Sequence, residues 1–205
     1  AVLTLSADGG RRRERLFRHV TEFIGNMPPE VRPAFSHERT DYLEFKETGS
    51  QIYIGTVGSR DFGRSETIHG LMVTELGSFS EAEAEATLTA VLESVVPGGY
   101  IVFETTPKLL GSHAHKFYRD CKAGRRPYRA GFVPWYWAED YHLRAGSIEA
   151  LPDDRGALRL TEAERGTAAH FQADGVSVED RIRWRRAKLA DRGAEFFSEY
   201  PEDET

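Results

Sequence analysis

Residues 68–75 read IHGLMVTE, a mostly apolar run that closes on a carboxylate. Residues 100–106 read YIVFETT, which is again an apolar run that ends in polar side chains. Apolar runs of this length indicate strands buried on both faces, as in a parallel sheet. Between them, one helical face carries an apolar stripe of Leu88, Val91, Leu92 and Val95. The two runs therefore predict parallel strands joined by a helix.

The flanking segments extend the same alternation. Val2 to Ser6 predicts a strand, and residues 16–24 predict a helix that ends before Pro28 and Pro29. Residues 42–45 and 51–57 predict a hairpin. Further along, the sequence predicts a helix over 112–123 and a strand over 128–133. The expected fold class is α/β, a mainly parallel sheet flanked by helices.

The alternation of predicted strands and helices ends at Pro134. Capping-box patterns at Thr161 to Glu164 and at Ser177 to Asp180 predict the starts of two helices. We therefore expect a sheet-containing core over residues 1–138 and a small helical part over residues 139–205. In the aromatic stretch between them, packing at a domain junction is favoured over base stacking for Trp135, Trp137 and Tyr141.

Composition limits the class of protein. The 205 residues hold 27 Lys plus Arg against 33 Asp plus Glu, a net charge of -6, which argues against a surface that coats nucleic acid everywhere. We interpret two arginine runs as solvated helix faces: Arg11, Arg12, Arg13, Arg15 and Arg18, then Arg181, Arg183, Arg185 and Arg186. Cys121 is the single cysteine, so no internal disulfide is expected and a reducing compartment is the simpler assumption. No secretion signal and no membrane span is indicated. The opening residues suggest a piece cut from a longer protein.

Polar side chains follow both apolar runs. Ligands gather beyond the carboxyl ends of parallel strands, so Glu75 is expected to share a crevice with Glu104, Thr105 and Thr106. A carboxylate there can hold or deprotonate the water that attacks a γ-phosphate. The alternative is that these residues are only helix caps or solvated loop residues.

Other chemistry has weaker support. No Gly-Lys pair occurs, so the phosphate-binding loop G-x-x-x-x-G-K-[ST] is missing from the chain. Arg60 and Arg64 lie in a glycine-bearing loop and could contact phosphate, or the loop is simply a surface loop. A zinc site at His113, His115 and Cys121 is disfavoured because no C-x-x-C partner accompanies them.

Taken in order, the motifs resemble the ATPase domain of the large terminase subunit of tailed bacteriophages, the motor that packages viral DNA into a procapsid. The resemblance spans almost the whole chain. It is carried by the helix after Leu3 to Ala7, Gly63 to Ser65, Ile68 to Gly70, Thr74-Glu75, Glu104 to Pro107, Lys116 to Tyr118, Pro134-Trp135, Trp184 to Arg186, and Phe197 to Pro201.

The resemblance implies roles for these residues. Glu75 matches the catalytic glutamate of the Walker B motif, and Glu104, Thr105 and Thr106 match the coupling motif. Thr74 stands where that motif usually has an aspartate, so its hydroxyl would only orient a metal-bound water, and no side chain is expected to bind the metal directly. The segment from Trp135 to Tyr200 looks like the lid and linker that lead toward a nuclease domain.

The function expected from this resemblance is Mg²⁺-dependent ATP hydrolysis coupled to translocation of double-stranded DNA. The implied fold is a partial P-loop NTPase with a helical lid, and the implied partners are viral DNA, a portal protein, a small terminase subunit and further copies in a ring. The implied location is the host cytoplasm, at the portal vertex of the procapsid. The chain alone is expected to be inactive. A helicase-like or recombination ATPase and a non-catalytic interaction module remain the alternatives.

Overall fold

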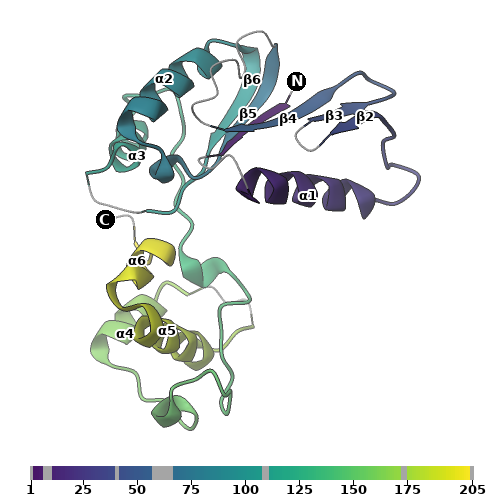
Figure 1. Ribbon diagram of the computed structural model, residues 1–205. Helices are drawn as coiled ribbons and strands as arrows, with labels where there is room; N and C mark the ends of the chain where they lie inside the picture. The colour runs from purple at the N-terminus through teal and green to yellow at the C-terminus, as the bar shows by residue number, and fades with distance from the viewer. Residues whose placement is uncertain are drawn as a thin grey trace. The chain divides into compact units, whose positions relative to one another are not determined.

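The computed structural model describes residues 2–6, 11–39, 42–56, 67–107, 111–171 and 175–203 of the chain. The chain divides into two units, Ala1–Thr105 and Thr106–Thr205 (Figure 1). The first unit is built on a β-sheet, and the second on helices and long loops.

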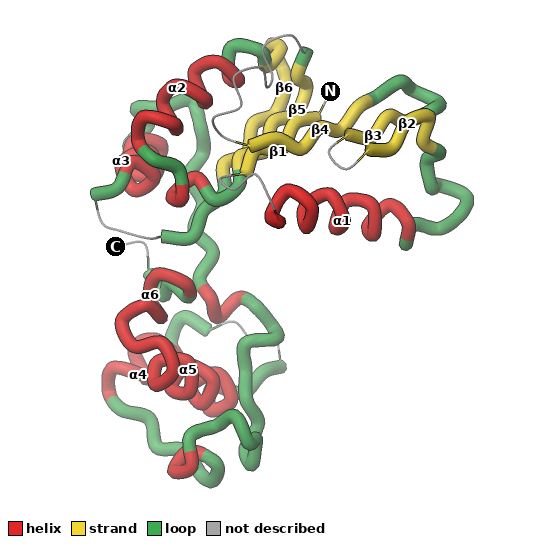
Figure 2. Tube along the Cα trace, in the orientation of Figure 1, coloured by secondary structure: helices red, strands yellow, loops and turns green. Residues whose placement is uncertain are grey.

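Within the described residues of the first unit, strands form one sheet in the order β2-β3-β4-β1-β5-β6 (Figure 2). β4, β1, β5 and β6 run parallel to one another, whereas β2 and β3 are antiparallel to their neighbours. The expected mixed α/β class is confirmed, and three of the five strand pairings in the sheet are parallel. The strands are β1 (Val2–Ser6), β2 (Phe35–Arg39), β3 (Tyr42–Phe45), β4 (Gln51–Thr56), β5 (Ile68–Val73) and β6 (Val95–Phe103).

The helices of this unit lie on opposite sides of the sheet (Figure 1). α1 (Arg11–Gly25) follows β1 and contacts β4, and α2 (Glu81–Leu92) joins β5 to β6. The register puts Ile54 and Met72 on one face, so Leu71 and Val73 belong to the other face, where both are 0% exposed. Apolar side chains on both faces are what parallel strands need.

Three details differ from the sequence prediction. β2 was not expected because its residues after Phe35 are polar and exposed, as an edge strand allows. β6 begins at Val95, so Val95 belongs to this strand and not to the apolar stripe of the helix, which ends at Leu92. The predicted strand over 128–133 is wrong: these residues form a loop, in which the Tyr128 ring lies 5.7 Å from the ring of Phe117 instead of the backbone pairing in a ladder.

The second unit contains α3 (His113–Lys122), α4 (Glu162–Ala168), α5 (Val178–Arg192) and α6 (Phe196–Glu199). The predicted cap of α4 is confirmed, because Thr161 and Glu164 exchange the two hydrogen bonds of a capping box. The predicted start of α5 is also confirmed, since the side chain of Ser177 accepts a hydrogen bond from the backbone of Asp180.

An aromatic cluster forms the core of the second unit. The ring of Trp184 stacks between Trp135 at 4.9 Å and Tyr141 at 4.6 Å. Phe196 is fully buried against them, and Tyr136 and Tyr200 complete the cluster. Trp135 and Tyr141 therefore pack as expected, but they do so inside the second unit and not at a domain junction. Trp137 differs, because it remains 47% exposed.

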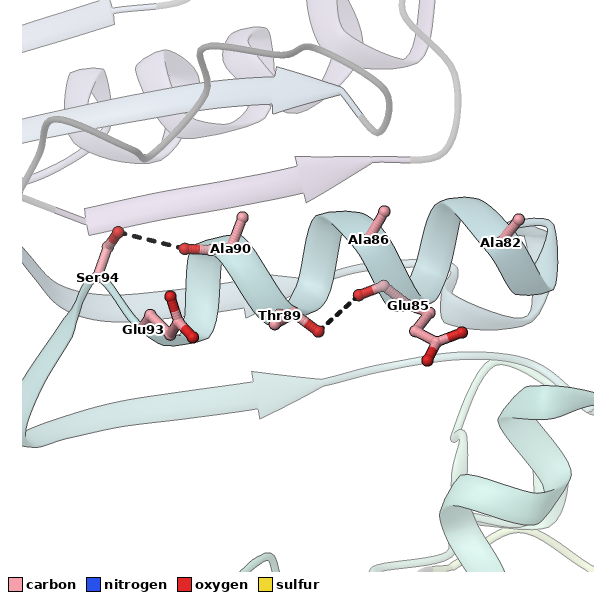
Figure 3. Close-up of a pocket in the computed structure, with 7 residues that line it drawn as sticks. All are labelled: Ala82, Glu85, Ala86, Thr89, Ala90, Glu93 and Ser94. Carbon is pink, nitrogen blue, oxygen red and sulfur yellow. Dashed lines mark hydrogen bonds between the residues drawn. The ribbon is translucent and has the colours of Figure 1, made fainter.

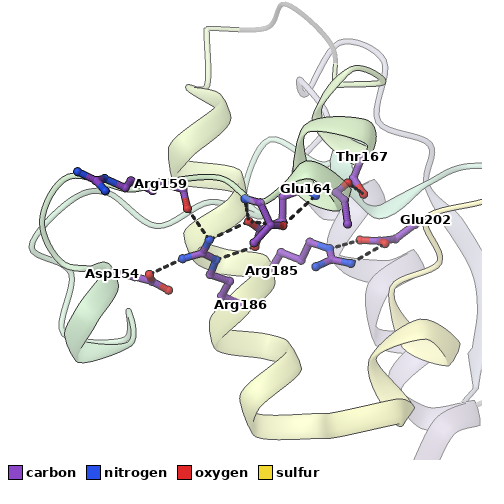
Figure 4. A network of polar contacts seen from close by, with 9 residues as sticks. Asp154, Arg159, Glu164, Thr167, Arg185, Arg186 and Glu202 are labelled. Carbon is purple, nitrogen blue, oxygen red and sulfur yellow. Dashed lines mark hydrogen bonds and ion pairs between the residues drawn. The ribbon is translucent and has the colours of Figure 1, made fainter.

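The arginine run of α5 is not a solvated face, so that prediction is wrong. Arg181 is 0% exposed and Arg183 5% exposed. Arg186 bridges Glu164 at 2.7 Å and Asp154 at 2.6 Å, while Arg185 forms an ion pair with Glu202 (Figure 4). The hydrogen bond from Arg186 lowers the pKa of Glu164 to about 2. Paired carboxylates and carbonyls satisfy guanidinium groups that solvent does not reach.

Candidate functional site

The tips of β5 and β6 converge, as their parallel pairing requires. The register brings Val73 opposite Phe103, and the next residue on the second strand, Glu104, donates its N–H to the carbonyl of Val73 at 2.8 Å. The backbone N–H of Glu75 faces Oε2 of Glu104 at 3.4 Å. The carboxylate of Glu104 therefore lies beside the backbone of Glu75.

A hydroxyl from the segment after β6 lies in the same place. Thr105 accepts a hydrogen bond from the N–H of Gly77 through Oγ1 at 2.9 Å. The N–H of Leu76 donates to the carbonyl of Glu104 at 3.1 Å, so the segment after β5 is tied twice to the segment after β6. These two hydrogen bonds hold the two segments together.

Glu75 has an unusual backbone. Its φ of 58° and ψ of 37° lie in the left-handed region, and it is the one non-glycine residue with positive φ in the described chain. A left-handed conformation costs a residue with a Cβ about 1 kcal/mol or more. It turns the chain abruptly out of β5 into the short 3₁₀ helix Leu76–Ser78. Such strain is found most often at functional sites.

The remaining predicted residues are placed as follows. Thr74 is buried, with 6% exposure, directly before Glu75. Thr106 follows Thr105 and is half-buried, but it is the first residue of the second unit. Arg60 and Arg64 lie outside the described residues, so their proposed phosphate contacts stay a prediction.

The sequence reasoning missed Gly77 and Ser78. Ser78 donates from Oγ to Oε2 of Glu75 at 3.2 Å, which fixes one carboxylate oxygen. The signal was present, because a Gly-Ser pair shortly after a strand is typical of a tight turn. Such a turn returns its polar groups toward the residue that precedes it.

The arrangement offers oxygen ligands only. Carboxylate and hydroxyl oxygens suit a hydrated Mg²⁺ and do not suit softer metals. Among the residues that the structure describes, no group of three or more His, Cys, Asp or Glu side chains could hold a metal ion. Within the disfavoured zinc set, Nδ1 of His115 accepts from the N–H of Gly111 at 2.8 Å, and burial raises the pKa of the Cys121 thiol.

A surface hollow lies elsewhere, along α2 (Figure 3). None of the strand-tip residues contributes to it, and it therefore plays no part in the candidate site. Its lining is Ala82, Glu85, Ala86, Thr89, Ala90, Glu93 and Ser94.

Comparison with protein-family models finds none that matches the chain, and comparison with curated proteins finds no match. In the described part of the chain, every helix is too short or too polar to cross a bilayer.

Proposed function

We propose that this chain is the hydrolysis half of a nucleotide site in a DNA-packaging motor that resembles the large terminase subunit. The observation that carries the proposal is the convergence of Glu75, Glu104 and Thr105 at the tips of two adjacent parallel strands. This edge is where α/β sheets bind their ligands. The P-loop topology and the lid role of residues 139–205 belong to the same proposal.

Each group has a definite task. Glu75 accepts a proton from, or orients, the water that attacks the γ-phosphate of ATP. Ser78 holds its carboxylate in place at 3.2 Å. Bound Mg²⁺ would neutralise charge on the phosphates, with Glu75 and the Thr74 hydroxyl on the side of its water ligands. Arg60 or Arg64 would contact phosphate.

Thr105 and Glu104 connect the site to the rest of the fold. Because Gly77 donates to Thr105, a shift of the Glu75 turn moves the tip of β6 and the residues that follow it, beginning with Thr106. Such a connection is what coupling of hydrolysis to movement of double-stranded DNA requires. The proposed partners are that DNA, a portal protein, a small terminase subunit and other copies in a ring at the procapsid portal vertex in the host cytoplasm.

The test is Glu75→Gln in the parent protein that carries this chain together with its phosphate-binding loop. Glutamine keeps the size and the bond from Ser78 but cannot take a proton, so kcat for ATP should fall about 100-fold or more while nucleotide affinity changes little. Glu93→Gln, at an exposed position directly after α2, is the matched control and should leave kcat unchanged. Undiminished turnover in the Glu75→Gln protein refutes the proposal.

The isolated chain should show no appreciable ATP turnover, because it contains no Gly-Lys phosphate loop. Steady-state hydrolysis by purified residues 1–205 at a rate that Glu75→Gln abolishes would show that another segment of the chain holds the phosphates.

A non-catalytic interaction module is the second candidate, and one contact favours it. The Thr105 hydroxyl is used by the Gly77 N–H, as a local cap would be. A parent protein that binds no ATP in equilibrium dialysis would support this reading. A helicase-like or recombination ATPase would instead bind and hydrolyse ATP without a portal protein.

A further inference from the structure

A strongly basic strip covers α3 and the turn after it, in the second unit. Residues 113–129 contain six Lys or Arg against one acid, Asp120, for a local charge of +5 in a chain whose net charge is -6. All six cations are exposed: Lys116, Arg119, Lys122, Arg125, Arg126 and Arg129. The arginine runs singled out from the sequence did not include this strip.

The helix places three of these cations in sequence. Lys116, Arg119 and Lys122 are spaced by three residues, so they follow one another along the helix surface over about 9 Å. Ala114 and Cys121 form the buried side of the same helix. The cations of the last turn also complement the helix dipole, but this accounts for only Arg119 and Lys122.

The turn after α3 folds back and holds two more guanidinium groups. Arg125 forms an ion pair with Asp120 at 2.6 Å, and Nε of Arg126 lies 3.8 Å from the other carboxylate oxygen. The Arg126 guanidinium also lies 4.7 Å above the ring of Phe117, which in turn stacks on Tyr128 at 5.7 Å. Both side chains are thus ordered while 63% and 47% exposed, respectively. The single charge of Asp120 cannot neutralise both of these guanidinium groups.

Arg119 and Arg129 have different surroundings. Neither side chain makes a hydrogen bond or an ion pair with any residue in the described ranges. Two exposed, uncompensated guanidinium groups beside four other cations produce a field that attracts a polyanion.

We propose that this strip, residues 116–129, binds the phosphate backbone of a nucleic-acid duplex. Arginine forms paired hydrogen bonds with phosphate oxygens, and four of the six cations are arginines. A duplex presents one charge per about 1.7 Å of its axis, so a strip of this length meets several phosphates at once. The inference gives a location for contact with the double-stranded DNA that the proposed function names, but duplex binding itself requires neither ATP nor Glu75, so the two proposals can fail separately.

An anionic membrane is the competing partner, and the structure favours it less. Membrane-surface helices pair their basic residues with exposed large apolar side chains. Among the described residues from 111 to 132, no large apolar side chain is exposed. The next exposed one along the chain is Val133, at 69% exposure.

The test uses the chain itself, residues 1–205, without nucleotide. A fluorescein-labelled 30-bp DNA duplex is titrated in 50 to 200 mM NaCl and binding is followed by anisotropy. The variant is Arg119→Gln with Arg129→Gln, chosen because neither side chain supports the fold in the described structure. The matched control is Arg15→Gln with Arg18→Gln on exposed positions of α1, which removes the same charge.

The unmodified chain should bind the duplex with an affinity that falls steeply with salt. The Arg119/Arg129 variant should bind about tenfold more weakly at 100 mM NaCl, and its salt slope should decrease by about 2, since each lost phosphate contact removes about 0.9. The α1 control should retain affinity within about twofold and keep the slope.

Three results would overturn the proposal. The first is absence of duplex binding by the unmodified chain at 50 mM NaCl. The second is an equal loss in both variants, which would mean that net charge alone matters. The third is sedimentation with phosphatidylserine vesicles, sensitive to the Arg119 and Arg129 changes, without binding to DNA. Circular dichroism checks that both variants remain folded.

Discussion

Glu75 shows how one residue can combine a chemical and a conformational role. At φ of 58°, any side chain with a Cβ is strained, and glycine is not. We predict that Glu75→Gly is more stable than Glu75→Ala by about 1 kcal/mol, although both lose the bond from Ser78. Urea unfolding of the two variants measures the difference. Equal stability, or a more stable alanine variant, would show that the turn is not strained in solution.

Glu164 provides a pH-dependent test at the same scale. The bond from Arg186 holds its pKa at about 2, below its ordinary 4.5. The folded state therefore gains stability above pH 4.5 and loses it as the pH falls toward 2. We predict that the free energy of unfolding decreases by on the order of 2 kcal/mol across this range, and that Glu164→Gln removes most of the decrease. Unfolding curves of the unmodified protein and of Glu164→Gln at pH 6, 4 and 3 measure this. The same loss of stability with pH in both proteins would contradict the pairing of Glu164 with Arg186.

At the scale of the element, β5 and β6 make a close contact that only glycine permits. A Cβ at Gly70 would collide with the ring of Tyr100, which lies over it and is 57% exposed. We predict that Gly70→Ala costs about 1 kcal/mol, and much less in a Tyr100→Ala background, because a small residue leaves room.

The control is Gly99→Ala, whose Cβ would approach the backbone carbonyls of His69 and Val96, each at 3.0 Å. Because backbone atoms cannot rotate away as a side chain can, Gly99→Ala should lower the free energy of unfolding more than Gly70→Ala does. Removal of the Tyr100 side chain should not reduce this loss. A double-mutant cycle from thermal unfolding separates the two positions. Additive costs for Gly70 and Tyr100 would refute the contact.

The elements also show what sequence alone could predict. The strands that lead to Glu75 and Glu104 could be predicted from the sequence. Long apolar runs identify such strands, and parallel pairing determines where their ends meet. The edge strand β2 could not be predicted in this way, since an exposed edge needs no apolar pattern. The α5 arginines were wrongly predicted to form a solvated face. Their partners Asp154, Glu164 and Glu202 are distant in sequence, and a run of charged residues has the same sequence pattern whether it is buried or solvated.

At the scale of the whole molecule, the two units should be separable. The rings around Trp184 all come from residues after 106, and so do the partners of Arg185 and Arg186. We predict that residues 106–205 fold alone, with a cooperative thermal transition and an aromatic circular dichroism signal. Trp184→Ala should abolish both, since removal of a buried Trp costs about 3 to 5 kcal/mol. A non-cooperative transition in the isolated unit would show that it depends on residues 1–105.

Glu202 has a consequence for handling the protein. Its carboxylate receives the indole N–H of Trp135 at 3.1 Å and the guanidinium of Arg185, and its carbonyl receives the Tyr136 hydroxyl at 3.4 Å. Carboxypeptidase trimming through this one position would release an indole, a phenol and a cation together, and tryptophan fluorescence would report it.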